Sequence, residues 1–290
     1  MINIVGIGTM GCKIAEKFEG EKQYKTFFIS HEHSKSKNSR NIPRASDPQK
    51  LEESCPSLKY LFKEARGESI LFVSGGEIIS SVTLRALEAL DSKKTTVFYI
   101  EPLKEILRGN IGLNENLVFH VIQEYARSGA IEKVVIISEE KLEEAIGDAP
   151  VISFQDMKHE FIASSVKLLC YFSNISPVYE VEGLKQEHSR ICTLSTIDMS
   201  KKKTNSLYDL NYSTEMLYYF GISEAELQND NKLMNRIKEI SNQRRGDLIS
   251  VTYRVFSTTY EQPQVLCLEK TMIVQERNED ENLRRDIQEE

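Results

Sequence analysis

The stretch Ile2-Asn-Ile-Val-Gly-Ile-Gly-Thr-Met-Gly-Cys12 decides the fold of the 290-residue chain. It opens with an apolar run that is typical of a buried strand, and apolar residues then recur at helical spacing up to Phe18. Between the two patterns, Gly6, Gly8 and Gly11 allow a tight turn whose backbone N–H groups can approach a phosphate at the helix N-terminus. The stretch therefore predicts a strand–turn–helix unit with a phosphate-binding loop; the alternative is a tight turn that binds nothing.

Strand and helix patterns go on alternating through the first half of the chain. Residues 31–50 are polar and predict a long loop. We expect strands at 2–7, 24–29, 69–73, 95–100 and 133–137, and helices at 9–18, 51–65, 77–90, 114–128 and 139–146. The strands are continuously apolar, which indicates an α/β fold: a Rossmann-like parallel sheet with helices on both faces.

The pattern changes after Pro150. A long central helix is expected at 154–172, followed by strands at 190–197, 248–256 and 265–274 and a helix at 231–241. The aromatic segment 208–220 fits either a subunit contact or packing between domains. We predict a first domain at 1–150, the central helix and a linking loop at 151–184, a smaller α+β second domain at 185–274 and an acidic tail at 275–290.

Composition narrows the function classes. There are 37 Lys and Arg against 44 Asp and Glu, a net charge of −7, which argues against general nucleic-acid binding. No apolar run approaches the ~20 residues of a membrane span, and we expect no signal peptide. The five cysteines are scattered without zinc-site spacing, so we expect reduced thiols in a cytoplasmic compartment. The triplet His31-Glu32-His33 lacks further ligands, and we predict no metal site.

The order of these features resembles the tubulin/FtsZ superfamily over most of residues 1–275. The turn from Gly6 to Gly11 resembles the family's first phosphate loop, and Ser74-Gly75-Gly76 resembles a shortened form of its glycine-rich signature loop. Glu101-Pro102 resembles the start of the sugar-binding loop, and the helix from about Phe154 resembles the long central helix that joins the two domains.

The resemblance implies a cytoplasmic protein that binds GTP or GDP, with Mg²⁺, and assembles head to tail into filaments with slow or absent GTP hydrolysis. It implies nucleotide contacts from Gly6, Gly8, Thr9, Met10, Gly11, Cys12, Ser74, Gly75, Gly76, Glu101, Phe154 and Asp156. An acidic loop of the next subunit completes catalysis in the family, and Glu180 and Glu182 fall nearest to that position. The alternatives are a core aromatic for Phe154 and solvated acids for the two glutamates. The acidic tail is either a partner-recruiting segment or a solvated terminus.

Two departures from the family keep other hypotheses open. Glu77 sets a carboxylate where phosphates would approach, and Ser138 or Glu139 stands in place of a base-contacting Asn. An acid beside a polyphosphate costs affinity unless a cation intervenes. A second hypothesis is therefore a non-catalytic tubulin-like structural or interaction protein with a decayed nucleotide site. A third is an NAD(P)-dependent oxidoreductase, in which Glu32 would hold the ribose hydroxyls.

Overall fold

The computed structural model describes residues 1–32, 37–45, 47–107, 109–184, 188–243 and 249–276. The strands are β1 Ile2–Ile7, β2 Tyr24–Ser30, β3 Ser39–Asn41, β4 Ser69–Ser74, β5 Thr95–Glu101, β6 Lys133–Ser138, β7 Tyr179–Val181, β8 Ile191–Asp198, β9 Lys203–Ser206, β10 Glu215–Ser223, β11 Ser250–Thr258 and β12 Gln264–Thr271. The helices are α1 Gly8–Glu16, α2 Pro48–Ser54, α3 Thr83–Ala89, α4 Asn110–Arg127, α5 Glu139–Ile146, α6 Val151–Ser173, α7 Glu224–Asn229 and α8 Leu233–Asn242. Short 3-10 turns are η1 Ile78–Val82, η2 Ser92–Lys94 and η3 Lys104–Ile106.

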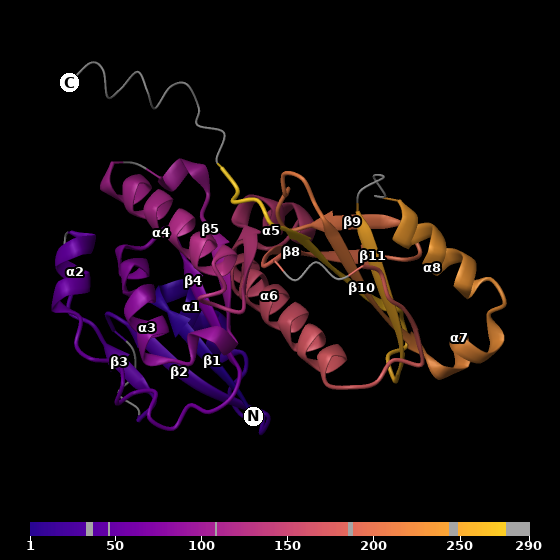
Figure 1. Ribbon diagram of the computed structural model, residues 1–290, viewed down its shortest axis with the longest axis horizontal. Helices are drawn as coiled ribbons and strands as arrows, with labels where there is room; N and C mark the ends of the chain where they lie inside the picture. The colour runs from indigo at the N-terminus through magenta and orange to yellow at the C-terminus, as the bar shows by residue number, and fades with distance from the viewer. Residues whose placement is uncertain (33–36, 46, 108, 185–187, 244–248, 277–290) are drawn as a thin grey trace, which may run out of the picture.

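Within these residues, twelve strands form one sheet in the order β3-β2-β1-β4-β5-β6-β8-β12-β10-β11-β7, with β9 on β8 (Figure 1). The strands from β3 to β8 are all parallel. This confirms the predicted Rossmann-like α/β fold. The strand order reverses between β1 and β4, and the crevice at the carboxyl ends of strands at such a switch point is where open α/β sheets bind ligands.

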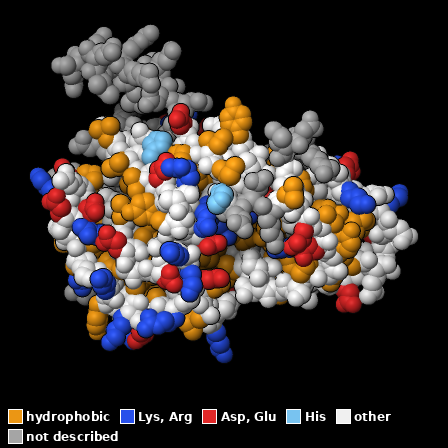
Figure 2. Space-filling model, in the orientation of Figure 1, with side chains coloured by type: hydrophobic (Ala, Val, Ile, Leu, Met, Phe, Trp, Pro, Cys, Tyr) orange, Lys and Arg blue, Asp and Glu red, His pale blue; other side chains and the backbone are white. Residues whose placement is uncertain are grey.

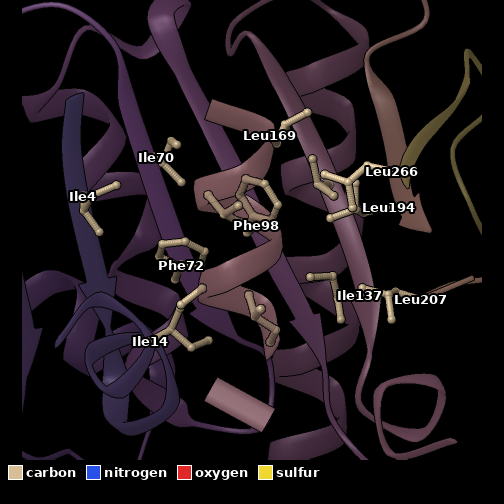
Figure 3. Packing of buried hydrophobic residues seen from close by; sticks show 14 of the residues in the cluster. Ile4, Ile14, Ile70, Phe72, Phe98, Ile137, Leu169, Leu194, Leu207 and Leu266 are labelled. Atoms are coloured by element: carbon tan, nitrogen blue, oxygen red, sulfur yellow. The ribbon is translucent and has the colours of Figure 1, made fainter. Parts of the chain in front are cut away.

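Helices cover both faces of the parallel strands, as their apolar sequences require. On one face α1, α5 and α6 bury Ile14, Leu142 and Ile162 against the sheet, in the core shown in Figure 3. On the other face η1, α3 and α4 bury residues such as Ile79 and Phe119. A third cluster lies under α8 in the second half. Each face of the sheet is therefore closed to water by helices over most of its width.

The strands of the second half continue the same sheet as those of the first. β6 and β8 pair in parallel from Val134 opposite Ile191 to Ile136 opposite Thr193. The long helix α6 packs across this joint, and residues of β1, β4 to β6, β8, β10, β11 and β12 share one core with it. At its C-terminal end, Phe172 stacks on Tyr219 at 5.9 Å and on Phe256 at 4.8 Å between ring centroids. α6 therefore links the two halves of the molecule.

Several elements differ from the sequence-based expectation. The aromatic segment 208–220 contributes β10, which lies between β11 and β12 and is buried along almost its whole length. Because both of its faces are covered, it lacks the apolar–polar alternation of a half-exposed strand. The predicted loop 31–50 contains β3 and the start of α2, and the helix expected at 77–90 is η1 followed by α3. The acidic tail beyond residue 276 lies outside the described residues.

The surface mixes both signs of charge. Figure 2 shows Lys and Arg side chains interspersed with Asp and Glu over the visible face. All five cysteines are free thiols. In the described part of the chain, no helix is both long and apolar enough to cross a bilayer.

Phe172→Ala tests the role of α6 as the link. The ring is 2 % exposed, so its removal leaves a cavity between α6, β10 and β11. We expect a loss of about 3–5 kcal/mol in the free energy of unfolding, measured by urea denaturation. Tyr171→Ala, at a neighbouring residue that is 42 % exposed, should cost about 1 kcal/mol or less. Equal losses in the two variants would contradict the assignment.

Candidate phosphate-binding site

The glycine turn lies directly between β1 and α1, as predicted. A Cβ atom on Gly11 would lie 2.4 Å from the Phe72 carbonyl oxygen of β4, and one on Gly6 would lie 2.5 Å from the Gly11 carbonyl oxygen. These two glycines therefore let α1 pack directly on β1 and β4. Gly8 has a φ of +76°, a left-handed conformation that glycine adopts without strain. The turn leaves the Thr9 and Met10 N–H groups at the N-terminus of α1, at the carboxyl ends of the strands that flank the switch point.

These N–H groups already donate hydrogen bonds to an acidic side chain of the same chain, that of Glu77. Its carboxylate oxygens accept from the Thr9 N–H at 2.8 and 2.9 Å and from the Met10 N–H at 3.2 Å. The Thr9 hydroxyl donates to the same carboxylate at 3.0 Å. α1 has no side-chain cap of its own at Ile7, so Glu77 satisfies donors that are otherwise left open at a helix start. The geometry shows that this turn can hold a bidentate oxyanion.

The second glycine loop lies beside the first. The Gly75 N–H donates to the Ile100 carbonyl, and a Cβ on Gly75 would overlap the Tyr99 hydroxyl, which donates to the buried Glu115 carboxylate at 2.5 Å. A Cβ on Gly76 would lie 3.0 Å from both Pro102 and Ile106. The loop after β4 therefore contacts the loop after β5, and it carries Glu77 onto α1.

Three further predicted contact residues point elsewhere or lie at the rim. Cys12 is buried, its thiol donates to the Gly6 carbonyl, and burial raises its pKa to about 12. Ser74 is also buried, and its hydroxyl accepts a long hydrogen bond of 3.5 Å from the Gly76 N–H. Glu101 ends β5 opposite Ser138 of β6 and is half-buried at the carboxyl edge. Of these three, only Glu101 lies where a ligand at that edge could reach it.

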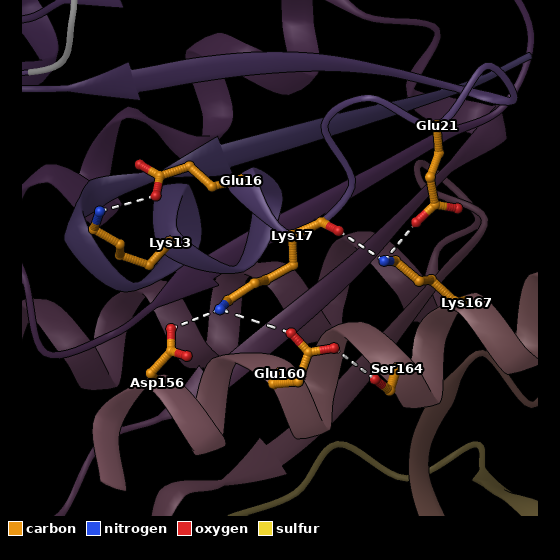
Figure 4. A network of polar contacts seen from close by, with 8 residues as sticks. All are labelled: Lys13, Glu16, Lys17, Glu21, Asp156, Glu160, Ser164 and Lys167. Atoms are coloured by element: carbon orange, nitrogen blue, oxygen red, sulfur yellow. Dashed lines mark hydrogen bonds and ion pairs between the residues drawn. The ribbon is translucent and has the colours of Figure 1, made fainter. Parts of the chain in front are cut away.

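Phe154 and Asp156, the two residues at the start of α6 that were predicted to contact the nucleotide, have different surroundings. Phe154 lines a pocket of about 450 Å³ together with Gly147, Asp148, Ala149, Val151 and Gln155. Asp156 instead pairs at 2.6 Å with Lys17, the residue that follows α1, within the network of Figure 4. The hydrogen bond from Lys17 lowers the pKa of Asp156. Asp156 is therefore engaged by an ion pair and is not among the residues that line the pocket beside Phe154.

The two predicted catalytic acids lie on the edge strand β7. Arg254 of β11 hydrogen-bonds Glu180, and its guanidinium lies 3.9 Å from Glu182. β7 ends the sheet on the side away from the β1–β4 crevice. Within one subunit these acids are therefore paired with a cation and remote from the glycine turn.

The remaining sequence candidates are at the surface. Glu32 is 80 % exposed and pairs with Arg44 at 2.9 Å, while His33 lies outside the described residues. No group of three or more His, Cys, Asp or Glu side chains within the described ranges is arranged to hold a metal ion.

A buried ion cluster that the sequence did not reveal fixes the start of α6. The ammonium group of Lys158, whose side chain is 1 % exposed, contacts Glu139 at 2.6 Å and Glu143 at 2.9 Å. It also lies 5.4 Å from the centre of the Phe154 ring. Burial acts to lower the pKa of Lys158, but the hydrogen bonds to the two carboxylates outweigh it, so the pKa is raised. The two ion pairs hold α6 against α5, and the ammonium group also makes a cation–π contact with Phe154.

Lys158→Met should destabilise the fold by about 3 kcal/mol, because it leaves two carboxylates at a buried junction without their cation. A lysine whose pKa is higher in the folded than in the unfolded protein stabilises the fold. This stabilisation is complete at pH values below the unfolded-state pKa and is lost as the pH rises through the folded-state pKa. The difference between wild type and variant, measured by urea unfolding, should therefore be constant between about pH 6 and pH 10, where both glutamates are ionised, and shrink above about pH 10. Adding Glu139→Gln should restore part of the loss. A difference that grows with pH would contradict this assignment.

This chain is similar to known proteins in its three-dimensional structure and not in its sequence. No family model and no curated protein matches the sequence. An empty FtsZ dimer from M. jannaschii is 15 % identical, with a TM-score of 0.64 over 93 % of this chain and 88 % of its own. A GTPγS-form protofilament of TubZ from Bacillus thuringiensis serovar israelensis is 12 % identical, with a TM-score of 0.70 over 99 % and 93 %.

A helical model of a four-stranded TubZ-Bt filament gives 12 % identity and a TM-score of 0.67 over 99 % of this chain and 89 % of that one. These matches span nearly the whole of both chains, so the two halves and α6 are arranged as in FtsZ and TubZ. The chain therefore has the tubulin/FtsZ-like fold.

Proposed function

We propose that this protein binds a guanine nucleotide at the start of α1 and assembles head to tail into cytoplasmic filaments. The observation that carries the proposal is the oxyanion held by Thr9 and Met10 in the switch-point crevice. A phosphate group needs the same donors that the Glu77 carboxylate now takes. The guanine base is proposed from the GTPγS form of the TubZ protofilament, whose fold this chain shares.

The pocket beside Phe154 is the proposed position of the base. Aromatic rings bind bases by stacking, which any base allows. Gln155 and Asp148 line the same pocket and supply hydrogen-bonding groups for a base edge. Lys158 and its two glutamates hold the turn of α6 from which the ring projects. Base specificity in this proposal rests on Gln155 and Asp148, with Phe154 as the stacking platform.

Exposed apolar side chains at the two ends of α6 support assembly. Val151 and Ile152 at its start are 90 % and 101 % exposed; we call this pair the upper patch. Val178 and Tyr179 follow its C-terminal end and are 60 % and 44 % exposed; we call this pair the lower patch. The 23-residue helix separates the patches by about 34 Å. Two different surfaces at opposite ends make a heterologous contact, which generates open filaments when identical subunits join.

Hydrolysis is proposed to be slow or absent. Glu180 and Glu182 are next to the lower patch, so a head-to-tail contact would bring them toward the neighbouring subunit's nucleotide. Both are already paired with Arg254, which weakens them as groups that polarise water. A second candidate function, a structural scaffold that no longer binds nucleotide, is favoured by the Glu77 carboxylate in the phosphate position.

Titration with fluorescent GTP, with light scattering recorded in the same sample, tests nucleotide binding and assembly together. We expect binding and a rise in scatter. Gly8→Glu should abolish both, because a side chain there is strained at φ +76° and meets the Glu77 carboxylate. A folded wild-type chain that binds no GTP would favour the scaffold, and binding of NADH instead would favour the oxidoreductase.

The head-to-tail contact has its own test. Ile152→Glu and Val178→Glu should each abolish filaments seen by electron microscopy while leaving GTP affinity unchanged, because each places a charge in one patch. Each variant keeps the patch that the other lacks, so an equal mixture should form heterodimers and no filaments. Tyr60→Glu, at an 85 % exposed residue outside both patches, should assemble normally. Filaments formed by either single variant would contradict the assigned contact.

A further inference from the structure

We infer that Glu77 is an autoinhibitory latch: its carboxylate holds the α1 N–H groups that a phosphate requires, so nucleotide binds only when this side chain leaves. The inference rests on the proposed nucleotide site and adds a means of regulating it. Both oxygens of the carboxylate are engaged, and they take the Thr9 N–H, the Thr9 hydroxyl and the Met10 N–H at once. A phosphate oxygen cannot share these donors with the carboxylate at the same position.

The contact differs from ordinary helix capping. A capping side chain normally comes from the residue just before the helix or from its first turn. Glu77 comes from the loop after β4, 68 residues along the chain from Thr9, and reaches α1 across the β1–β4 switch point. It is only half-buried, so solvent can receive the carboxylate when it moves away. The contact thus joins two loops that can separate without unfolding either strand.

The segment that carries Glu77 contains and contacts buried polar atoms that lack hydrogen-bond partners among the described residues. Glu77 precedes η1, which packs on α4. Asn114 of α4 is 5 % exposed and donates to Ser80 of η1, yet its Oδ1 atom accepts no hydrogen bond from the described residues. The Ser81 hydroxyl of η1 is likewise without a partner there. Buried polar groups without partners are costly, so the segment that carries Glu77 is packed less favourably than one whose polar groups are all paired.

Gly75 and Gly76 lie between the fixed end of β4 and Glu77. Glycine pairs allow large backbone rotations at little steric cost. Gly75 is held by the Ile100 carbonyl and packs against Tyr99, whereas the Gly76 N–H makes a long hydrogen bond of 3.5 Å to the Ser74 hydroxyl. Rotation at Gly76 is therefore the movement that releases the carboxylate from α1.

The expected change in nucleotide affinity depends on the fraction of molecules in which Glu77 is bound to α1. The apparent dissociation constant of a ligand is its intrinsic value divided by the fraction of binding-competent protein. If the latch is closed in about 90 to 99 % of molecules, its removal tightens binding about 10- to 100-fold. Glu77→Ala removes the competitor, and Glu77→Gln keeps its size and one acceptor while removing the charge.

Fluorescence anisotropy with a labelled GTP, competed by unlabelled inorganic tripolyphosphate, measures this directly on the full chain. We expect Glu77→Ala to bind both about 10- to 100-fold more tightly than wild type, with Glu77→Gln between them. Glu105→Gln removes an exposed acid from η3, beside the same loop, and should change affinity by less than about twofold. Circular dichroism and thermal melting establish that each variant is folded.

Backbone amide exchange of the nucleotide-free proteins gives a second readout. Thr9 and Met10 should exchange faster in both Glu77 variants, because their acceptor is lost or weakened, and at the wild-type rate in Glu105→Gln. Equal affinities for wild type and both Glu77 variants, with binding in all three, would overturn the latch and leave the nucleotide site standing. Absence of GTP and tripolyphosphate binding in all three folded proteins would overturn the nucleotide site, and the latch with it.

Discussion

The contact on which the structure depends is the close approach of α1 to β1 and β4. It exists because Gly6 and Gly11 carry no side chains: a Cβ on either would lie within about 2.5 Å of backbone atoms. This approach fixes the N-terminus of α1 in the crevice where the strand order reverses. A helix start in that place is an anion site, because its N–H groups have no partners within the helix. The chain satisfies them with its own Glu77. The same residue thus completes the fold and competes for the site.

The second organising element is α6. Its first turns are tied to α5 by the Lys158 ion cluster, and its last turn is anchored by Phe172 between β10 and β11. Because α6 is one continuous helix of 23 residues, the proposed base pocket at its start and the lower patch beyond its end are joined by a single element. This arrangement offers a direct path by which a ligand at one end could bias contacts at the other. Burying the Lys158 ammonium group carries a desolvation penalty, which its ion pairs with Glu139 and Glu143 offset.

Much of the fold could be predicted from the sequence, since the first half has long, strongly periodic segments. The strands β1, β2 and β4 to β6 and the helices α1, α5 and α6 lie within a few residues of their predicted ranges, whereas β3 lies in a predicted loop. β10 was missed because a strand buried on both faces has no alternation to detect, and β7 and β9 are too short to give a signal. The contacts of the candidate site were harder to predict from the sequence than the fold. The sequence predicted that Glu77 would stand in the phosphate position, but not that it binds the Thr9 and Met10 amides. Lys158 joins residues 15 and 19 positions away, and Asp156 turned toward Lys17; neither pairing has a local pattern.

A structure of the protein crystallised with a slowly hydrolysed GTP analogue tests the central claim most directly. The account predicts phosphate oxygens on the Thr9 and Met10 N–H groups, the Glu77 carboxylate displaced toward solvent, and subunits stacked so that the upper patch of one meets the lower patch of the next. A chain that keeps Glu77 on α1 at saturating analogue, with the crevice holding no phosphate, would contradict it. That result would leave a tubulin-like scaffold whose own carboxylate has permanently replaced the ligand.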